Sequence, residues 1–223
     1  IEFESEIYIG ANTGVYELLS EELRLSTANP ILKSLNVKSF YVDFENELWI
    51  NSSTGIYNLK DPLRKLNSNR GLTNNYVTTS DWVGQNRLIG MYGGGVQLYN
   101  RNNGIKSPLI LDEIKNEIVL DLLVNNNEVW IGTMNNGVYV WNLKRNELKN
   151  FNVNNGLSNN HVKKIVKDKW GNIWLGTSGG GISIYNNSPF LEYNKTNGLN
   201  SNYIYAVVKD HANNLWVSTE GTG

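Results

Sequence analysis

The chain has 223 residues, with 20 Lys and Arg against 21 Asp and Glu, and it contains no cysteine. The lack of cysteine excludes disulfides, thiolate metal sites, iron–sulfur clusters and a cysteine nucleophile. The near-zero net charge without a long basic run argues against a nucleic-acid-binding protein. No stretch approaches the roughly 20 apolar residues of a transmembrane helix, so we expect no membrane contact by this segment. With 40% hydrophobic residues, the composition predicts a folded core.

A short aromatic motif recurs from the first residues to the last. Its clearest copies read Glu-Val-Trp-Ile-Gly-Thr at 128–133, Asn-Ile-Trp-Leu-Gly-Thr at 172–177 and Asn-Leu-Trp-Val-Ser-Thr at 214–219. Weaker copies precede them, and the intervals between the six anchor positions are 41, 39, 42, 44 and 42 residues. The anchors are, in chain order, Tyr8, Trp49, Leu88, Trp130, Trp174 and Trp216.

Each repeat is predicted to hold four short strands. One strand precedes the anchor, as at 162–167 and 203–209, and the anchor lies in the second. Alternating apolar runs such as 138–141 and 182–185 indicate a third strand, and we expect a fourth at 148–153 and 190–194. A glycine in a turn-forming context precedes the third strand, where a positive φ is needed. These glycines are Gly14, Gly55, Gly95, Gly137, Gly181 and Gly223.

Four strands at a period of roughly 40–45 residues are the signature of a β-propeller blade. The predicted fold class is therefore all-β, a β-propeller of four-stranded antiparallel blades with about five to six blades present. The length divided by the mean period of 41.6 residues gives about 5.4 units, so we expect residues 1–223 to be a single propeller domain or a fragment of a larger ring. Residues 18–25 and 109–120 are ambiguous between helix and strand, and we interpret the second as loop running into strand.

The repeat unit resembles the two-component regulator propeller repeat, best from Asn155 to Tyr185 and again from Asn197 to Gly223. The shared features are an Asn-Gly-Leu connector, an Asp six residues before the tryptophan, the Trp-x-Gly-Thr anchor and a glycine-rich turn. The resemblance implies the extracytoplasmic sensor region, periplasmic or at the cell surface, of a bacterial hybrid two-component receptor. It also implies propellers of about seven blades, output domains outside this chain and, in many members, an oligosaccharide ligand.

The connectors 70–75, 155–160 and 197–202 each lead into the first strand of a repeat. In a propeller such loops open onto one face near the central channel, so we expect the residues at this strand entry to converge there. Tyr and His rings with Asn amides suit a neutral carbohydrate. The alternative is that they are ordinary turn and strand-entry residues. The candidate ligand-binding residues are Asn75, Tyr76, Asn160, His161, Asn202 and Tyr203.

Other polar and aromatic residues favour structural interpretations. We interpret the anchor aromatics as core between blades rather than as sugar platforms. Asp43, Asp168 and Asp210 are interpreted as turn residues that bond their own backbone rather than as acids or metal ligands. His161 and His211 lie 50 residues apart at different repeat positions, so we expect no metal site and no cofactor.

The sequence therefore predicts a non-enzymatic, ligand-sensing propeller segment of a two-component-type receptor. Its expected partners are an oligosaccharide or other small ligand, the output domains of the parent receptor and a second copy of the chain in a homodimer. The first alternative is a structural or scaffolding propeller that binds protein in the cell envelope. The second is a propeller lyase, in which His161 would be the sole candidate base at the strand entry, with no acid predicted beside it.

Overall fold

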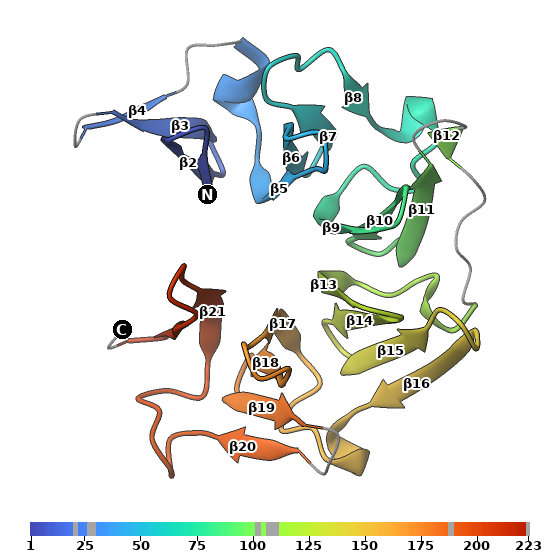
Figure 1. Cartoon of the computed structure of the whole chain (residues 1–223), viewed down its shortest axis with the longest axis vertical. Helices are drawn as coiled ribbons and strands as arrows, with labels where there is room; N and C mark the ends of the chain where they lie inside the picture. The colour runs from blue at the N-terminus through green and yellow to red at the C-terminus, as the bar shows by residue number, and fades with distance from the viewer. Residues whose placement is uncertain (20–21, 26–29, 101–103, 106–111, 187–189, 222–223) are drawn as a thin grey trace. The chain divides into compact units, whose positions relative to one another are not determined.

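The computed structural model describes the chain except residues 20–21, 26–29, 101–103, 106–111, 187–189 and 222–223 (Figure 1). Over the described ranges the secondary structure is six antiparallel sheets with four short 3-10 helices, as the sequence predicts. The chain divides into two compact units, Ile1–Asn116 and Glu117–Gly223. None of the helices in these ranges has the length and apolar character of a membrane span.

The first unit holds three four-stranded sheets, in which strands adjacent in the chain pair with each other. The first sheet is β1 (Glu2–Phe3), β2 (Glu6–Ala11), β3 (Gly14–Leu19) and β4 (Glu22–Leu25). The second is β5 (Val37–Val42), β6 (Leu48–Ser52), β7 (Gly55–Asn58) and β8 (Lys65–Leu66). The third is β9 (Val77–Val83), β10 (Asn86–Met91), β11 (Val96–Asn100) and β12 (Gly104–Ile105). The 3-10 helices of this unit are η1 (Pro30–Ser34), η2 (Ser68–Arg70) and η3 (Asp112–Ile114).

The second unit repeats the same pattern. Its first two sheets are β13 (Val119–Asn125), β14 (Glu128–Thr133), β15 (Val138–Asn142) and β16 (Glu147–Phe151), then β17 (Val162–Lys167), β18 (Ile173–Thr177), β19 (Ile182–Tyr185) and β20 (Leu191–Tyr193). The last sheet pairs β21 (Ile204–Lys209) with β22 (Leu215–Thr219), and η4 spans Val153–Asn155. The predicted fourth strands are present within two residues of their expected bounds, while Gly223 lies outside the described residues.

The two ambiguous segments are also resolved where the structure describes them. Residues 18–19 and 22–25 belong to the paired strands β3 and β4, so this segment is a β-hairpin. In the segment 109–120, η3 is followed by β13 at Val119, and residues 109–111 lie outside the described part. The interpretation of loop running into strand is therefore correct except for one short 3-10 turn.

The anchor residues form core between adjoining sheets within each unit. Trp130 is 1% exposed and belongs to one cluster with Val162 and Ile165 of the next sheet. Leu88 is buried, and Tyr8, Trp49 and Trp174 are partly buried against equivalent clusters. Trp216 in the last sheet differs, because its side chain is 62% exposed. The predicted core role is thus observed at every anchor except the last.

The residue two positions after the anchor lies where the next sheet comes closest. A Cβ atom on Gly176 would lie 2.9 Å from Cγ2 of Ile204 and 3.0 Å from Cγ2 of Val207. A Cβ atom on Gly132 would likewise lie 3.1 Å from Cγ1 of Val162. Glycine at this position therefore allows two sheets to pack without a gap.

An aspartate closes the turn between the first two strands in three of the sheets. The Oδ1 atom of Asp168 accepts the backbone N–H groups of Trp170 and Asn172, each at 2.9 Å. Its Oδ2 atom accepts the indole N–H of Trp174 at 2.9 Å. Asp43 and Asp210 accept the indole N–H groups of Trp49 and Trp216 at the same distance. The predicted bond of the aspartate to its own turn is confirmed. Its bond to the indole of the anchor tryptophan was not predicted from the sequence.

Replacing Gly176 by alanine should destabilise the second unit. The added methyl group would overlap two aliphatic side chains of the next sheet, and overpacking of this kind costs about 1–3 kcal/mol. Urea unfolding followed by tryptophan fluorescence measures the change. Ser218→Ala is the matched control, because Ser218 has the same repeat position and is exposed. Equal stability of the two variants would show that the sheets are not packed this closely.

Replacing Asp168 by asparagine should lower stability at neutral pH by about 1–3 kcal/mol, since hydrogen bonds to a charged group are lost. Burial raises the pKa of Asp168, but the hydrogen bonds from Trp174, Asn172 and the backbone outweigh it and leave the pKa below its usual value. The carboxylate therefore stabilises the fold above its unfolded pKa of about 3.9, and this stability is lost as the pH falls through the folded pKa. Urea unfolding of both proteins at pH 7 and pH 3 should show a gap that narrows in acid. A gap independent of pH would contradict this assignment.

Candidate functional site

The three candidate asparagines close the connector loops in which they lie. The side-chain oxygen of Asn160 accepts the backbone N–H of Val153 at 2.9 Å. Asn75 and Asn202 make the same bond across the same seven-residue span, to Ser68 at 2.6 Å and to Lys195 at 2.7 Å. The amide oxygens are therefore committed to the loops. The side-chain nitrogens make no hydrogen bond to described residues and are the groups that a ligand can use.

The residue that follows each of these asparagines anchors the first strand to its own sheet. The backbone carbonyl of Tyr76 accepts the N–H of Tyr92 at 2.9 Å, and that of His161 accepts the N–H of Ser178 at 2.9 Å. Tyr203 accepts from Glu220 in the same way, at 3.0 Å. The main chain at this position is thus held the same way in three sheets, while the side chain varies.

In the second unit, adjoining sheets bring His161 and Tyr203 to the same turn. His161 bonds Ser178 at one side of this turn, and Ser178 also forms an antiparallel bridge with Tyr203 of the next sheet. The carbonyl of Asn202 accepts the N–H groups of Gly179 and Gly181 at 3.0 and 2.8 Å. Three of the six predicted residues, His161, Asn202 and Tyr203, are therefore gathered around the turn at 178–181. Asn160 precedes His161 in the chain, but its carbonyl accepts the N–H of Gly137 in the corresponding turn of the preceding sheet at 2.9 Å.

Two further residues extend this surface, which we call the entry surface and which consists of Asn160, His161, Lys163, Asn202, Tyr203 and Tyr205. The ammonium group of Lys163 lies 4.8 Å from the ring centroid of Tyr205. Tyr203 and Tyr205 are 50% and 56% exposed. The imidazole of His161 is half-buried, and burial together with the nearby Lys163 lowers its pKa. At neutral pH the ring is therefore uncharged and offers one donor and one acceptor.

In the first unit the candidates Asn75 and Tyr76 have different neighbours. The ring of Tyr76 lies 5.0 Å from that of Tyr92, and the ammonium group of Lys38 lies 4.9 Å from the Tyr76 ring centroid. The phenol of Tyr76 is thus engaged in an aromatic pair and a cation–π contact. Among the described residues no group of three His, Asp or Glu side chains is placed to hold a metal ion.

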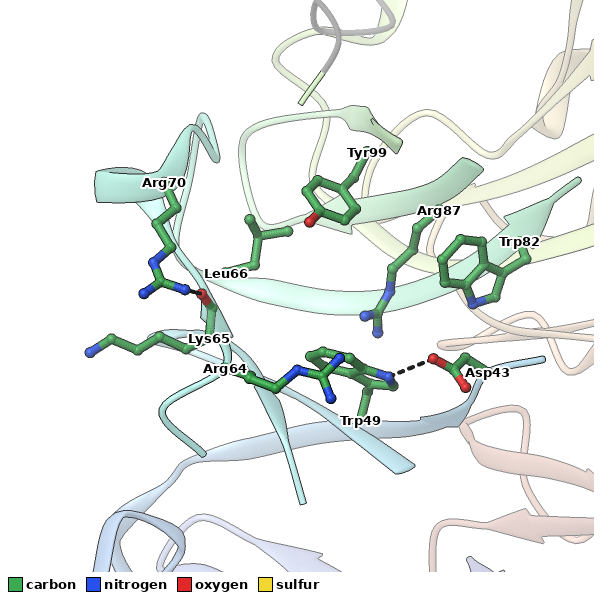
Figure 2. Close-up of a pocket in the computed structure, with 9 residues that line it drawn as sticks. All are labelled: Asp43, Trp49, Arg64, Lys65, Leu66, Arg70, Trp82, Arg87 and Tyr99. Carbon is green, nitrogen blue, oxygen red and sulfur yellow. Dashed lines mark hydrogen bonds between the residues drawn. The ribbon is translucent and has the colours of Figure 1, made fainter. Parts of the chain in front are cut away.

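The first unit also contains a cavity of about 300 Å³ that the sequence reasoning missed. Figure 2 shows its lining side chains, which come from the second and third sheets and the segment that joins them. A signal was present in the repeat, because Arg87 occupies the position before the anchor, where the other copies carry Ile, Leu or Val. The lining residues are Asp43, Trp49, Arg64, Lys65, Leu66, Arg70, Trp82, Arg87 and Tyr99.

The sheets, their order and their mutual packing within each unit are those of a β-propeller. Residues 156–179 and 198–221 match the model of the two-component regulator propeller family. These two segments lie where the repeat most resembles that family. Among curated proteins no sequence matches this one significantly.

Solved structures with the same fold include two extracellular domains from B. thetaiotaomicron. One belongs to a putative hybrid two-component system, with 23% identity, a TM-score of 0.82 and coverage of 97% of this chain and 31% of that one. The other belongs to a putative one-component system, with 20% identity, a TM-score of 0.79 and coverage of 98% and 31%. Virginiamycin B lyase from Staphylococcus aureus is similar at 12% identity and a TM-score of 0.70, over 96% of this chain and 74% of the lyase. The chain thus spans about a third of the two extracellular domains.

Replacing Asn160 by alanine should destabilise the connector before β17. The N–H of Val153 would lose its acceptor, which costs about 1 kcal/mol when water replaces it only in part. Differential scanning calorimetry measures the shift. Asn154→Ala, one residue further along η4, is the control, because its side chain makes no hydrogen bond to described residues. If both variants melt alike, Asn160 is free for another role.

Proposed function

We propose that this chain is a ligand-sensing segment of the extracytoplasmic region of a bacterial two-component-type receptor. It binds an uncharged oligosaccharide on the entry surface of the second unit. The observation that carries the proposal is that His161 and Tyr203, from adjoining sheets, flank one turn with the ring of Tyr203 half exposed. The family repeats and the fold shared with extracellular domains of such systems support the receptor assignment.

The chemistry of the entry surface suits a sugar. Exposed phenol rings offer apolar faces on which the C–H face of a pyranose can stack, with a hydroxyl at the rim. A neutral imidazole and the side-chain nitrogens of Asn160 and Asn202 supply hydrogen-bonding groups around those rings. Because the surface has residues from two sheets, a bound sugar would restrain β17 against β21. Domains of the parent receptor outside this chain would transmit this change as the signal.

The proposed activity is binding without turnover. The fold is shared with a lyase, and His161 is a neutral imidazole that can accept a proton, which is the observation that favours an enzymatic alternative. Prolonged incubation of the protein with a bound oligosaccharide, followed by chromatography, separates the two. We expect the sugar to be recovered unchanged, and a product whose yield depends on His161 would establish the lyase instead.

The binding proposal is tested with a panel of neutral oligosaccharides in thermal-shift and calorimetric titrations. Tyr203→Ala should weaken the binding of a positive sugar by roughly twofold to tenfold, the worth of one aromatic contact. Trp170→Ala is the matched control, because Trp170 is 74% exposed but lies in the turn after β17, at the end of that strand opposite His161. It should leave the affinity unchanged.

Two results would contradict this proposal. A sugar whose affinity falls with Trp170→Ala and not with Tyr203→Ala would move the site to the other end of the strands. Failure of every neutral oligosaccharide, together with retention of an envelope protein in a pull-down, would favour the scaffolding alternative.

A further inference from the structure

The contact between the second and third sheets differs in composition from the other contacts between sheets. At the position two after the anchor, where Gly132 and Gly176 allow close packing, the second sheet carries Asn51, which is fully buried. Its Nδ2 donates to Ser80 Oγ of the third sheet at 3.0 Å. Arg87 completes the group by donating from Nη2 to the same Ser80 oxygen at 2.9 Å. Between the second and third sheets, a polar network thus takes the place of the close contact that a glycine makes elsewhere.

Arg87 is a buried cation in a position that the repeat reserves for an apolar residue. Its side chain is 3% exposed, and in the equivalent place the other sheets have residues such as Leu48, Val129 and Ile173. No carboxylate of the described residues forms an ion pair with it. Burial lowers the pKa of Arg87 to about 10, so the guanidinium is still charged at neutral pH. A buried charge without an ion-pair partner is costly.

The rings around Arg87 compensate this charge only in part. The guanidinium carbon lies 5.4 Å from the ring centroids of both Tyr41 and Trp49. The Nε atom of Arg87 is buried without a hydrogen-bond partner, and so is Nε1 of Trp82, the residue paired with Arg87 across β9 and β10. The cavity wall therefore contains two buried donors that lack an acceptor (Figure 2).

The remaining charges of the cavity leave it cationic. Arg64, Lys65 and Arg70 lie in the wall together with Arg87, against Asp43 as the one lining carboxylate. Asp43 is already occupied, since its oxygens accept the N–H groups of Glu45, Glu47 and the Trp49 indole. Arg64 pairs with Glu47 at 2.6 Å, so Lys65, Arg70 and Arg87 outnumber the single negative charge of Asp43 and the cavity keeps a net positive charge. An anion is the ligand that this balance favours.

We propose that this cavity binds a small organic acid, a single ring bearing a carboxylate, with the carboxylate on Arg87 and the ring against Trp49 and Leu66. A carboxylate accepts strong, charge-assisted hydrogen bonds from a guanidinium. Nη2 of Arg87 is committed to Ser80 and Asn51, whereas Nη1 makes no hydrogen bond to described residues and is the donor for the carboxylate. The indole and leucine supply apolar contact for the ring. A volume of about 300 Å³ is at the lower end of the range of ligand pockets. The site is in the first unit and is independent of the oligosaccharide proposal for the second.

The test uses calorimetric titration and tryptophan fluorescence of the full chain, since Trp49 and Trp82 line the cavity. Glucuronate and benzoate are the two acids, for a sugar or an aromatic source of the ring, and glucose and benzamide are their neutral counterparts. At least one acid should bind at least about tenfold more tightly than its counterpart, because a charge-assisted hydrogen bond contributes about 1.5–3 kcal/mol. If neither acid binds better than its neutral counterpart, the proposal is wrong.

The decisive variant is Arg87→Leu, which restores the residue type of the other repeats. It should abolish the preference for the acid while the melting temperature stays the same or rises, because Ser80 and Asn51 still bond each other. An arginine with a purely structural role would instead give a lower melting temperature and unchanged acid binding. Arg145→Ala, an exposed arginine of the second unit, is the control and should change neither.

A rim variant keeps the test decisive if Arg87→Leu does not fold. Arg70 is exposed and lines the cavity, and its side chain makes one hydrogen bond to described residues, to the carbonyl of Lys65 at 3.1 Å. Arg70→Gln should weaken acid binding about twofold to fivefold at low salt, as a partly screened charge does. Acid binding that is indifferent to both Arg70→Gln and added salt would overturn the proposal.

Discussion

A four-stranded sheet has two faces, and in the described part of this chain, where the helices are four short 3-10 turns, another sheet must cover them. In this chain two residues of the second strand of a sheet make that contact possible. Trp130 and Gly132 lie two residues apart on β14, so both point to the same face. The large ring fills the space between sheets, and the glycine lets the next sheet approach. The spacing of the repeat along the sequence follows from this contact, because each new sheet must bring the same pair into the same place.

Most of the fold could be predicted because its determinants are local. Alternating strands, turns with glycine or asparagine, and an aspartate that bonds its own turn all act within a few residues. The indole bond of Asp168 could not be foreseen, since it depends on how far the Trp174 side chain reaches across the folded hairpin. Strand ends were less certain for the same reason, because pairing partners decide where a strand stops.

The candidate site could be predicted only in part. The grouping of His161 and Tyr203 follows from their repeat positions, whereas the loop-closing bond of Asn160 depends on a loop that bends back over seven residues. The Arg87 cavity was missed because its wall is assembled from the second and third sheets and the segment between them. Its two unusual residues, Asn51 and Arg87, are visible in the sequence as departures from the repeat, but only the structure shows that they meet.

The Asp–Trp pair has a consequence for how the chain folds. Its hydrogen bonds join residues that are six or fewer positions apart, as between Asp43 and Trp49 or between Asp210 and Trp216. Each such hairpin can therefore close before any neighbouring sheet exists, and only short loops have to be ordered to form it. In these three hairpins the bond holds the indole in place without a contribution from the next sheet. Contacts this local in sequence are the kind that favours fast folding, and in an all-β protein they offset part of the cost of pairing distant strands.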